Sequence, residues 1–169
     1  MMFSLFLRLF FKKKHFSGIL SSKVYLSSYS FLINEEGIQI SGDGILDKTI
    51  NKAINTNNVT YANVSGSFDA IGDEVFNGCP KIVCVILPET IVEIGKDSFV
   101  NCPMLNDIRI PNMLRKIGNN SFQNVNISSF FIPKDCVDIG TFVLHRCYNL
   151  TSIVVDKGNL FFVATDDVL

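Results

Sequence analysis

The sequence has no excess of basic residues. Its 169 residues contain 15 Lys and Arg against 16 Asp and Glu, which gives a formal net charge of −1. A protein that binds nucleic acid needs a basic surface to neutralise the phosphate backbone. The one basic cluster, Lys12–His15, is short. The composition therefore argues against nucleic acid as the main partner.

Histidine and paired cysteines, which supply most metal sites and many nucleophilic sites, are also scarce. The chain has two histidines, His15 and His145, and five cysteines without a CxxC pair. A structural zinc site normally uses paired ligands two to four residues apart, with a second pair downstream. A catalytic nucleophile needs an oriented base within hydrogen-bond reach. We therefore expect no metal site, no cofactor and no catalytic residue, so the chain is predicted not to be an enzyme.

Long hydrophobic runs are missing as well. The apolar run Met1–Phe11 has eleven residues and is interrupted by Arg8, whereas a helix that spans a bilayer needs about 20. Its basic residues follow the apolar run, which is the reverse of the order in a secretory signal. Four interpretations of Met1–Lys14 remain open: a membrane-surface anchor, an atypical or uncleaved export signal, a packed helix and an artefactual upstream start.

What the sequence does contain is a repeat of about 23 residues. The dipeptide Ile-Gly recurs with its glycines at positions 72, 95, 118 and 140, at intervals of 23, 23 and 22 residues. The fourth repeat is therefore one residue short. Three other columns keep the same register, namely Phe76, Phe99, Phe122 and Leu144; Cys79, Cys102, Val125 and Cys147; and Pro88, Pro111 and Pro133.

Each repeat begins with an apolar pattern typical of a half-buried strand. The pattern starts at Val59, Ile82, Leu105, Ile127 and Leu150, and its last two apolar positions alternate with period two. One unit cannot bury its apolar face, but stacked units bury a continuous core. We therefore predict a solenoid with an aromatic column of Phe76, Phe99 and Phe122. We also expect positive φ at the corner glycines and a single helical or 3-10 turn around each phenylalanine.

Two neighbouring repeats carry a resemblance to a known family. Ile86–Leu105 (ILPETIVEIGKDSFVNCPML) and Ile108–Val125 (IRIPNMLRKIGNNSFQNV) resemble the BspA-like leucine-rich repeat. The resemblance covers residues 59–155, although Val125 and Leu144 depart from the family pattern. It implies a right-handed leucine-rich-repeat-like solenoid of about 4 to 5 coils of about 23 residues, with parallel strands and short helical or 3-10 turns. Members are mostly surface-associated proteins of bacteria and protist parasites, which implies an adhesion-type binding module.

The resemblance extends to both sides of the repeats. Ile38–Leu46 resembles the strand that precedes such arrays, and Asp47–Ile54 resembles the helix that leads into the first repeat. Asn159–Leu169 resembles the hairpin with which these arrays often continue. We therefore divide the chain into an N-terminal segment without an assigned role (1–37), a strand-helix cap (38–58), the repeat solenoid (59–155), and an incomplete C-terminal hairpin or start of a further repeat (156–169).

The outward side of the first strands is the predicted binding face. Side chains alternate along a strand, so the residues between the inward ones point outward. Exposed apolar, aromatic and Arg groups in one patch have the composition of an interaction hot spot. The alternative is that residues 1–37 fold over this sheet and cover it. The predicted partner-binding residues are Tyr61, Asn63, Ile86, Asp107, Arg109, Phe131 and Val154.

Two further expectations concern covalent modification. Cys79 and Cys102 occupy equivalent positions in adjacent coils, whose spacing permits a disulfide, although a buried free thiol is the expected state. The acceptor pattern for N-glycosylation occurs five times, at Asn58, Asn63, Asn119, Asn126 and Asn149.

The sequence leaves three functions open for the same solenoid. The first is a cell-surface or secreted adhesion protein that binds a protein partner, and the second is an intracellular scaffold or adaptor. The third is a truncated structural member of the family that self-associates through an open C-terminal coil. The family resemblance implies the cell surface or secretion, and a cytoplasmic location follows if Met1–Lys14 is not a signal.

Overall fold

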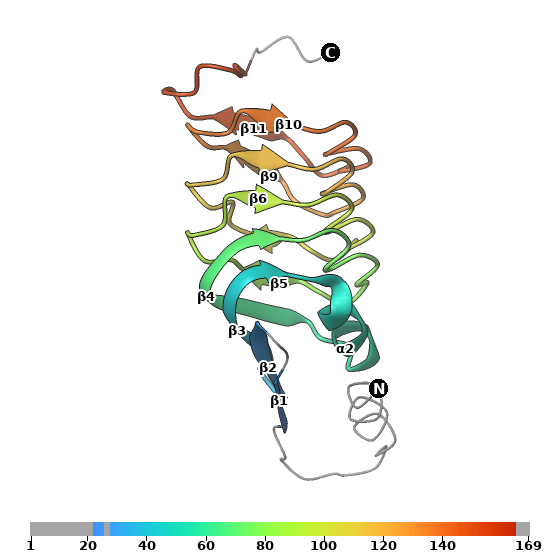
Figure 1. The fold of residues 1–169 in the computed structure, drawn as a ribbon. Coiled ribbons are helices and arrows are strands. Elements are labelled where there is room, and N and C mark those ends of the chain that lie inside the picture. The colour runs from blue at the N-terminus through green and yellow to red at the C-terminus, as the bar shows by residue number, and fades with distance from the viewer. Residues whose placement is uncertain (1–21, 26–27, 165–169) are drawn as a thin grey trace.

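The chain winds into a stack of coils, each of which adds one strand to two faces of the stack (Figure 1). The computed structural model describes residues 22–25 and 28–164. The first-strand face contains the first part of β4 (Tyr61–Ile71), then β5 (Cys84–Ile86), β7 (Asp107–Ile108), β9 (Ser129–Ile132) and β11 (Ser152–Val155). The second-strand face contains the last part of β4, then β6 (Glu93–Ile94), β8 (Lys116–Ile117) and β10 (Asp138–Ile139). All hydrogen-bonded pairs between these strands are parallel, as a solenoid of identical coils requires.

A strand and a helix precede the first repeat, where the resemblance placed them. β3 (Gly37–Leu46) pairs in parallel with β4, and it is followed by the 3-10 helix η1 (Lys48–Ile50) and by α2 (Asn51–Thr56). Asp47 caps η1, because its side chain accepts a hydrogen bond from the Thr49 amide at 2.8 Å. The buried residues Ile50, Ala53 and Ile54 of these helices cover the start of the hydrophobic core.

Two antiparallel strands extend the sheet at its N-terminal edge. β1 (Ser22–Tyr25) pairs with β2 (Tyr29–Asn34), and β2 pairs with β3. These strands lie beside β3 rather than over the first-strand face (Figure 1). The alternative in which residues 1–37 cover that face is therefore wrong for the described part of the segment. Residues 1–21, and with them the apolar run and basic cluster of Met1–Lys14, lie outside the described residues.

The predicted aromatic column is confirmed. The rings of Phe76 and Phe99 stack with centroids 5.0 Å apart, and those of Phe99 and Phe122 stack with centroids 5.1 Å apart. All three side chains are completely buried. Phe122 also contacts Phe130 edge to face at 5.1 Å. Equivalent large side chains therefore lie directly above one another along the core, as expected for stacked repeats.

The prediction of positive φ at the corner glycines is wrong. Among the described glycines, positive φ occurs at Gly37, Gly44, Gly66 and Gly78, and none of these belongs to an Ile-Gly corner. The corners need glycine because successive coils approach too closely for a side chain. A Cβ atom on Gly95 would lie 2.5 Å from the Asp73 carboxylate and 2.7 Å from the Asp73 amide nitrogen. The repeat therefore conserves contact between backbones of adjacent coils rather than an unusual backbone conformation.

The segments around the core phenylalanines are single turns, as predicted, and in the first the Asn77 amide donates to the Glu74 carbonyl at 3.3 Å, which is the bond pattern of a 3-10 turn. In the first, the amides of Glu74, Phe76 and Gly78 donate to carbonyls of the next coil at 3.0, 2.7 and 2.8 Å. Glu74 and Gly78 have φ of 61° and 62°, and later coils repeat this positive φ at equivalent positions. The alternate residues thus form a third hydrogen-bonded line between coils. An α-helix pairs its amides within one segment, whereas these amides pair between coils.

The C-terminal hairpin is only partly within the described residues. Residues 159–164 contain no strand, and residues 165–169 lie outside the described part of the chain. Within residues 22–25 and 28–164, no helix is long and apolar enough to cross a membrane.

Candidate protein-binding face

The predicted binding residues lie on the outward side of the first-strand face. Pairing between strands places Asn63 beside Ile86 and Phe131 beside Val154. Ile86 and Val154 are 46% and 52% exposed, so both present apolar surface on this face. The other members range from half-buried to exposed, namely Tyr61, Asn63, Asp107, Arg109 and Phe131. The strand alternation therefore placed these side chains outward as expected, and their role in binding stays a prediction.

This face is interrupted between its third and fourth coils. Among the described strands, β7 pairs only with β5 on this face, and β9 pairs only with β11. On the opposite side of the same two coils, β8 and β10 remain paired through Ile117 and Ile139. The interruption is therefore confined to the strand pairing of the first-strand face; directly before β9, the Asn126 amide still donates to the Leu105 carbonyl at 2.9 Å.

A one-residue deletion lies directly before the interrupted strand. Leu105 lies three positions after Cys102, and Leu150 lies three positions after Cys147 in the equivalent turn. Ile127, which leads into β9, lies only two positions after Val125. The shorter turn brings β9 onto the face one residue early. We attribute the missing pairing between β7 and β9 to this shorter approach, since ladder pairing depends on register.

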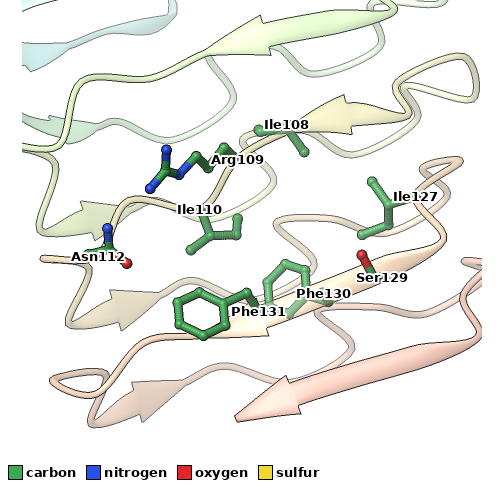
Figure 2. A pocket seen from close by; sticks show the side chains of 8 residues that line it. All are labelled: Ile108, Arg109, Ile110, Asn112, Ile127, Ser129, Phe130 and Phe131. Carbon is green, nitrogen blue, oxygen red and sulfur yellow. The ribbon is translucent and has the colours of Figure 1, made fainter. Parts of the chain in front are cut away.

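A groove of about 380 Å³ lies at the interruption. Figure 2 shows Ile110 between Arg109 on one side and the rings of Phe130 and Phe131 on the other. The groove is mainly apolar, and Arg109 is its one charged lining residue. It is lined by Ile108, Arg109, Ile110, Asn112, Ile127, Ser129, Phe130 and Phe131. Of these residues, the sequence analysis predicted Arg109 and Phe131 as binding residues. The other lining residues could have been found from the 22-residue interval, because the missing residue changes strand pairing at this point.

Arg109 is held loosely at the rim of the groove. Its guanidinium lies 3.7 Å from a Glu89 carboxylate oxygen, with 80% of the Arg109 side chain exposed. The other Glu89 oxygen accepts hydrogen bonds from the backbone and side-chain nitrogens of Asn112, at 2.8 and 3.2 Å. Because an exposed ion pair of this length contributes little to stability, Arg109 retains most of its capacity to bind another carboxylate.

The cysteines are free thiols in the structure, and most are buried in the core. Cys102 donates to the Phe76 carbonyl at 3.0 Å, and Cys147 donates to the Phe122 carbonyl at 3.1 Å. Burial raises the pKa of the Cys136 and Cys147 thiols above their usual value. A raised pKa keeps these thiols protonated at neutral pH, so they lack the thiolate that nucleophilic chemistry requires.

Cys84 is the thiol nearest to the candidate binding residues. It lies on β5 beside Asp107 of β7 and is half-buried. Burial, together with the neighbouring Asp107 carboxylate, raises the pKa of Cys84 to about 11. The thiol is therefore neutral at physiological pH and adds a small apolar surface to the face.

Side chains that could bind a metal ion or act as a base are few in the described residues. Residues 22–25 and 28–164 contain no group of three or more His, Cys, Asp or Glu side chains arranged to hold a metal ion. His145 is exposed in a turn, where its ring contacts Phe142 edge to face at 5.8 Å.

The five glycosylation motifs occupy different environments. Asn58 is exposed, and within the described structure its side chain makes no hydrogen bond. The Asn63 amide donates to Gln39 at 2.9 Å, and Asn119 accepts a bond from the Thr141 amide at 2.8 Å. The remaining two, Asn126 and Asn149, pair with each other. Modification at any of these positions stays a prediction.

Known structures share this fold. A leucine-rich repeat protein from Eubacterium ventriosum ATCC 27560 is similar with a TM-score of 0.64 and 21% identity, over 82% of this chain and 45% of that one. A leucine-rich repeat protein from Bacteroides capillosus ATCC 29799 is similar with a TM-score of 0.50 and 18% identity, over 80% of this chain and 99% of that one. The chain thus spans less than half the length of the E. ventriosum protein. A search of curated protein sequences found no match.

The repeat itself matches a family model. The model for the BspA type leucine rich repeat region matches residues 47–163 in six copies, which is well over half of the 169-residue chain. The matched range contains the aromatic column, the close-packed glycine corners and every strand of the interrupted face. The chain therefore belongs to the BspA-type leucine-rich repeat family.

Proposed function

We propose that this chain is a non-enzymatic protein-binding module of a cell-surface or secreted adhesion-type protein, and that it binds through the first-strand face. The observation that carries the proposal is the exposure of Ile86 and Val154 on the same face as Arg109 and the apolar groove. Aromatic and Arg side chains are enriched in protein interfaces, and burial of exposed apolar surface adds favourable free energy. Membership of the BspA-type family supports the adhesion role.

The two strand faces differ in the free energy that covering them with a partner would cost or gain. The outward residues of the second-strand face include Glu93 and Lys116, which form an ion pair at 2.9 Å, and Asp138 beside Lys116. Covering these groups would remove charges from water, which costs free energy unless the partner compensates each one. Covering Ile86 and Val154 would instead bury apolar surface, which is favourable. This difference favours the first-strand face.

Site-specific photocrosslinking tests the choice of face. We would place a benzophenone amino acid at position 86 or 154, and at position 113 or 137 as controls, since Met113 and Val137 are comparably exposed but lie outside the first-strand face. Each purified protein would be irradiated on cultured cells and on immobilised extracellular proteins. The proposal predicts that positions 86 and 154 capture a discrete partner and that 113 and 137 do not.

A double substitution provides the matching loss-of-function test. Phe131→Ser with Arg109→Ala should abolish capture of that partner while the circular dichroism spectrum and melting temperature stay unchanged, because both side chains reach the surface. If the variant unfolds, these residues belong to the core and the proposed face is wrong. Equal crosslinking from all four positions would show that the protein has no preferred binding face.

An intracellular scaffold that uses the same face is the second candidate. The five free cysteines favour it, because unpaired thiols are typical of reducing compartments. The compartment can be tested by expressing the chain from Met1 in a eukaryotic host and removing N-glycans enzymatically. A mobility shift would support export and adhesion. Unshifted protein recovered from the cytosol would support the scaffold.

A further inference from the structure

The groove between β7 and β9 has the features of a site for an extended peptide. The strand segments that border it have no strand partner across the interruption. Ile110 and Phe130 are 5% and 3% exposed and form its buried floor, half-buried Phe131 supplies an apolar side chain at the surface, and Arg109 supplies a loosely paired cation at the rim. An occupant that matches these features has an extended backbone, a large apolar side chain and a nearby carboxylate. Added strands commonly combine backbone hydrogen bonds with side-chain pockets in this way.

A segment with this composition follows the last coil of the same chain. Leu160, Phe161 and Val163 are 91%, 64% and 80% exposed in the described structure. In an extended chain Phe161 and Val163 project to the same side. The sequence continues with Asp166 and Asp167, which supply two carboxylates shortly after the apolar residues.

The position of this segment favours binding between two molecules. Its described part, residues 160–164, lies beyond β11 at the C-terminal end of the stack (Figure 1). The groove lies between β7 and β9, on the side of β9 away from β11. The described part of this segment therefore lies beyond β11, away from the groove of its own molecule, and we expect it to reach the groove of a second molecule.

We propose that the groove between β7 and β9 binds residues 160–169 of a second copy of this chain, with Phe161 against half-buried Phe131 and with Asp166 or Asp167 beside Arg109. The inference rests on the proposed function, because the groove is part of the first-strand face. The contact joins two different surfaces and is therefore head-to-tail, so it extends to chains of molecules as the concentration rises.

A synthetic peptide of residues 157–169 is the direct probe. Fluorescence anisotropy with the full chain should show saturable binding with a Kd below about 1 mM. Substituting Phe161→Ala, or both aspartates by asparagine, in the peptide should weaken binding by about tenfold or more. Light scattering of the full chain should show a mass that rises with concentration and falls when free peptide is added. Absence of peptide binding at about 1 mM, or a constant monomer mass, overturns the proposal.

Two protein variants locate the site. Arg109→Glu should weaken peptide binding by about tenfold or more, and a peptide with Asp166→Arg and Asp167→Arg should restore it. Arg115→Glu makes the same charge change at an exposed position outside the groove and should leave binding unchanged. Equal weakening by Arg109→Glu and Arg115→Glu would mean that overall charge, not the groove, determines binding.

Repairing the short repeat is the sharpest test of the groove itself. Inserting one residue between Val125 and Asn126 restores the three-residue spacing of the other coils. The restored register should pair β7 with β9, close the groove and abolish peptide binding, while the melting temperature stays equal or rises. Undiminished peptide binding by a folded insertion variant overturns the proposal. If the insertion variant does not fold, the Arg109→Glu exchange decides.

The outcomes also separate this inference from the proposed function. If the peptide does not bind but positions 86 and 154 still crosslink to a different protein, only the inference fails. If crosslinking from these positions yields only the mass of two chains and the peptide competes for it, the second copy is the partner of the whole face. If neither peptide binding nor face-specific crosslinking occurs, both proposals fail.

Discussion

Truncation of Phe99 is the most direct test of the stacked core. Phe99 is completely buried between Phe76 and Phe122, with its ring stacked on both at 5.0 and 5.1 Å. Phe99→Ala removes the ring from the centre of the column and leaves a cavity that neighbouring coils cannot fill, because their backbones are hydrogen-bonded to each other. Phenylalanine truncation in a core costs about 3–5 kcal/mol. Each lost aromatic pair accounts for about 0.5–1.5 kcal/mol beyond burial, so we expect the upper half of that range.

Urea unfolding followed by circular dichroism measures the loss in the free energy of unfolding, and thermal unfolding followed in the same way measures the melting temperature. At about 2–4 °C per kcal/mol for a chain of this size, the melting temperature should fall by roughly 8–20 °C. Phe142→Ala is the matched control, because Phe142 is 68% exposed and already has positive φ, so the substitution changes neither core packing nor the type of backbone strain. The control should change stability by no more than about 0.5 kcal/mol. A Phe99→Ala loss below about 1.5 kcal/mol, or one equal to the control, would refute the stacked column.

Three other predictions follow from the backbone and the exposed face. Gly95→Ala should destabilise the fold by about 1–3 kcal/mol in urea titrations, because its Cβ would lie 2.5 Å from the Asp73 carboxylate and 2.7 Å from the Asp73 amide. Gly78→Ala, where a Cβ meets open space but φ is +62°, should cost about 1–2 kcal/mol from backbone strain alone; no loss there would argue against the turn conformation. Alkylation of Cys84, followed by peptide mass spectrometry, should accelerate steadily from pH 8 towards about 11, because its pKa is raised to about 11. Asp107→Asn removes a neighbouring group that raises this pKa, so it should increase the rate at pH 9; an unchanged rate would contradict that assignment.

The sequence predicted the repeating parts of the fold because each depends on spacing alone. Phe76, Phe99 and Phe122 recur at 23 residues, and one coil of the solenoid consumes that number of residues, so their rings must stack. The outward direction of Ile86 and Val154 followed equally from strand alternation. Both inferences require only that every coil have the same path.

The errors occurred where neighbouring coils, rather than neighbouring residues, determine the structure. Gly95 has an ordinary φ, and the reason for glycine there is the backbone of Gly72 and Asp73 in the preceding coil. The turns around the phenylalanines were predicted, but their positive φ was not, although it had a local signal, since Asn and Asp tolerate positive φ better than most residues. Asn101 and Asn120 have positive φ, as the abundance of Asn in these segments could have indicated.

The only sign of the groove in the sequence was the 22-residue interval between two of the repeats. The 22-residue interval revealed a missing residue, but the interval alone does not show which side of the coil opens. That requires placing the deletion between Val125 and Ile127, directly before β9. The opening also stays on one face only because the other two lines of hydrogen bonds are intact. These lines are the pairing of β8 with β10 and the turn line, in which the Phe122 amide donates to the Val143 carbonyl at 3.1 Å.

Most adjacent coils are joined by three lines of hydrogen bonds, and the short turn before β9 lies where one of these lines is interrupted. Where all three lines are made, backbone hydrogen bonds join adjacent coils at three places around each turn of the solenoid. Between the third and fourth coils two lines are complete, and beside the interrupted strands the Asn126 amide donates to the Leu105 carbonyl at 2.9 Å. The first-strand face is therefore the side on which the third and fourth coils share the fewest hydrogen bonds. A single residue gained or lost in such a turn changes strand pairing on one face while the other two lines of hydrogen bonds continue past it.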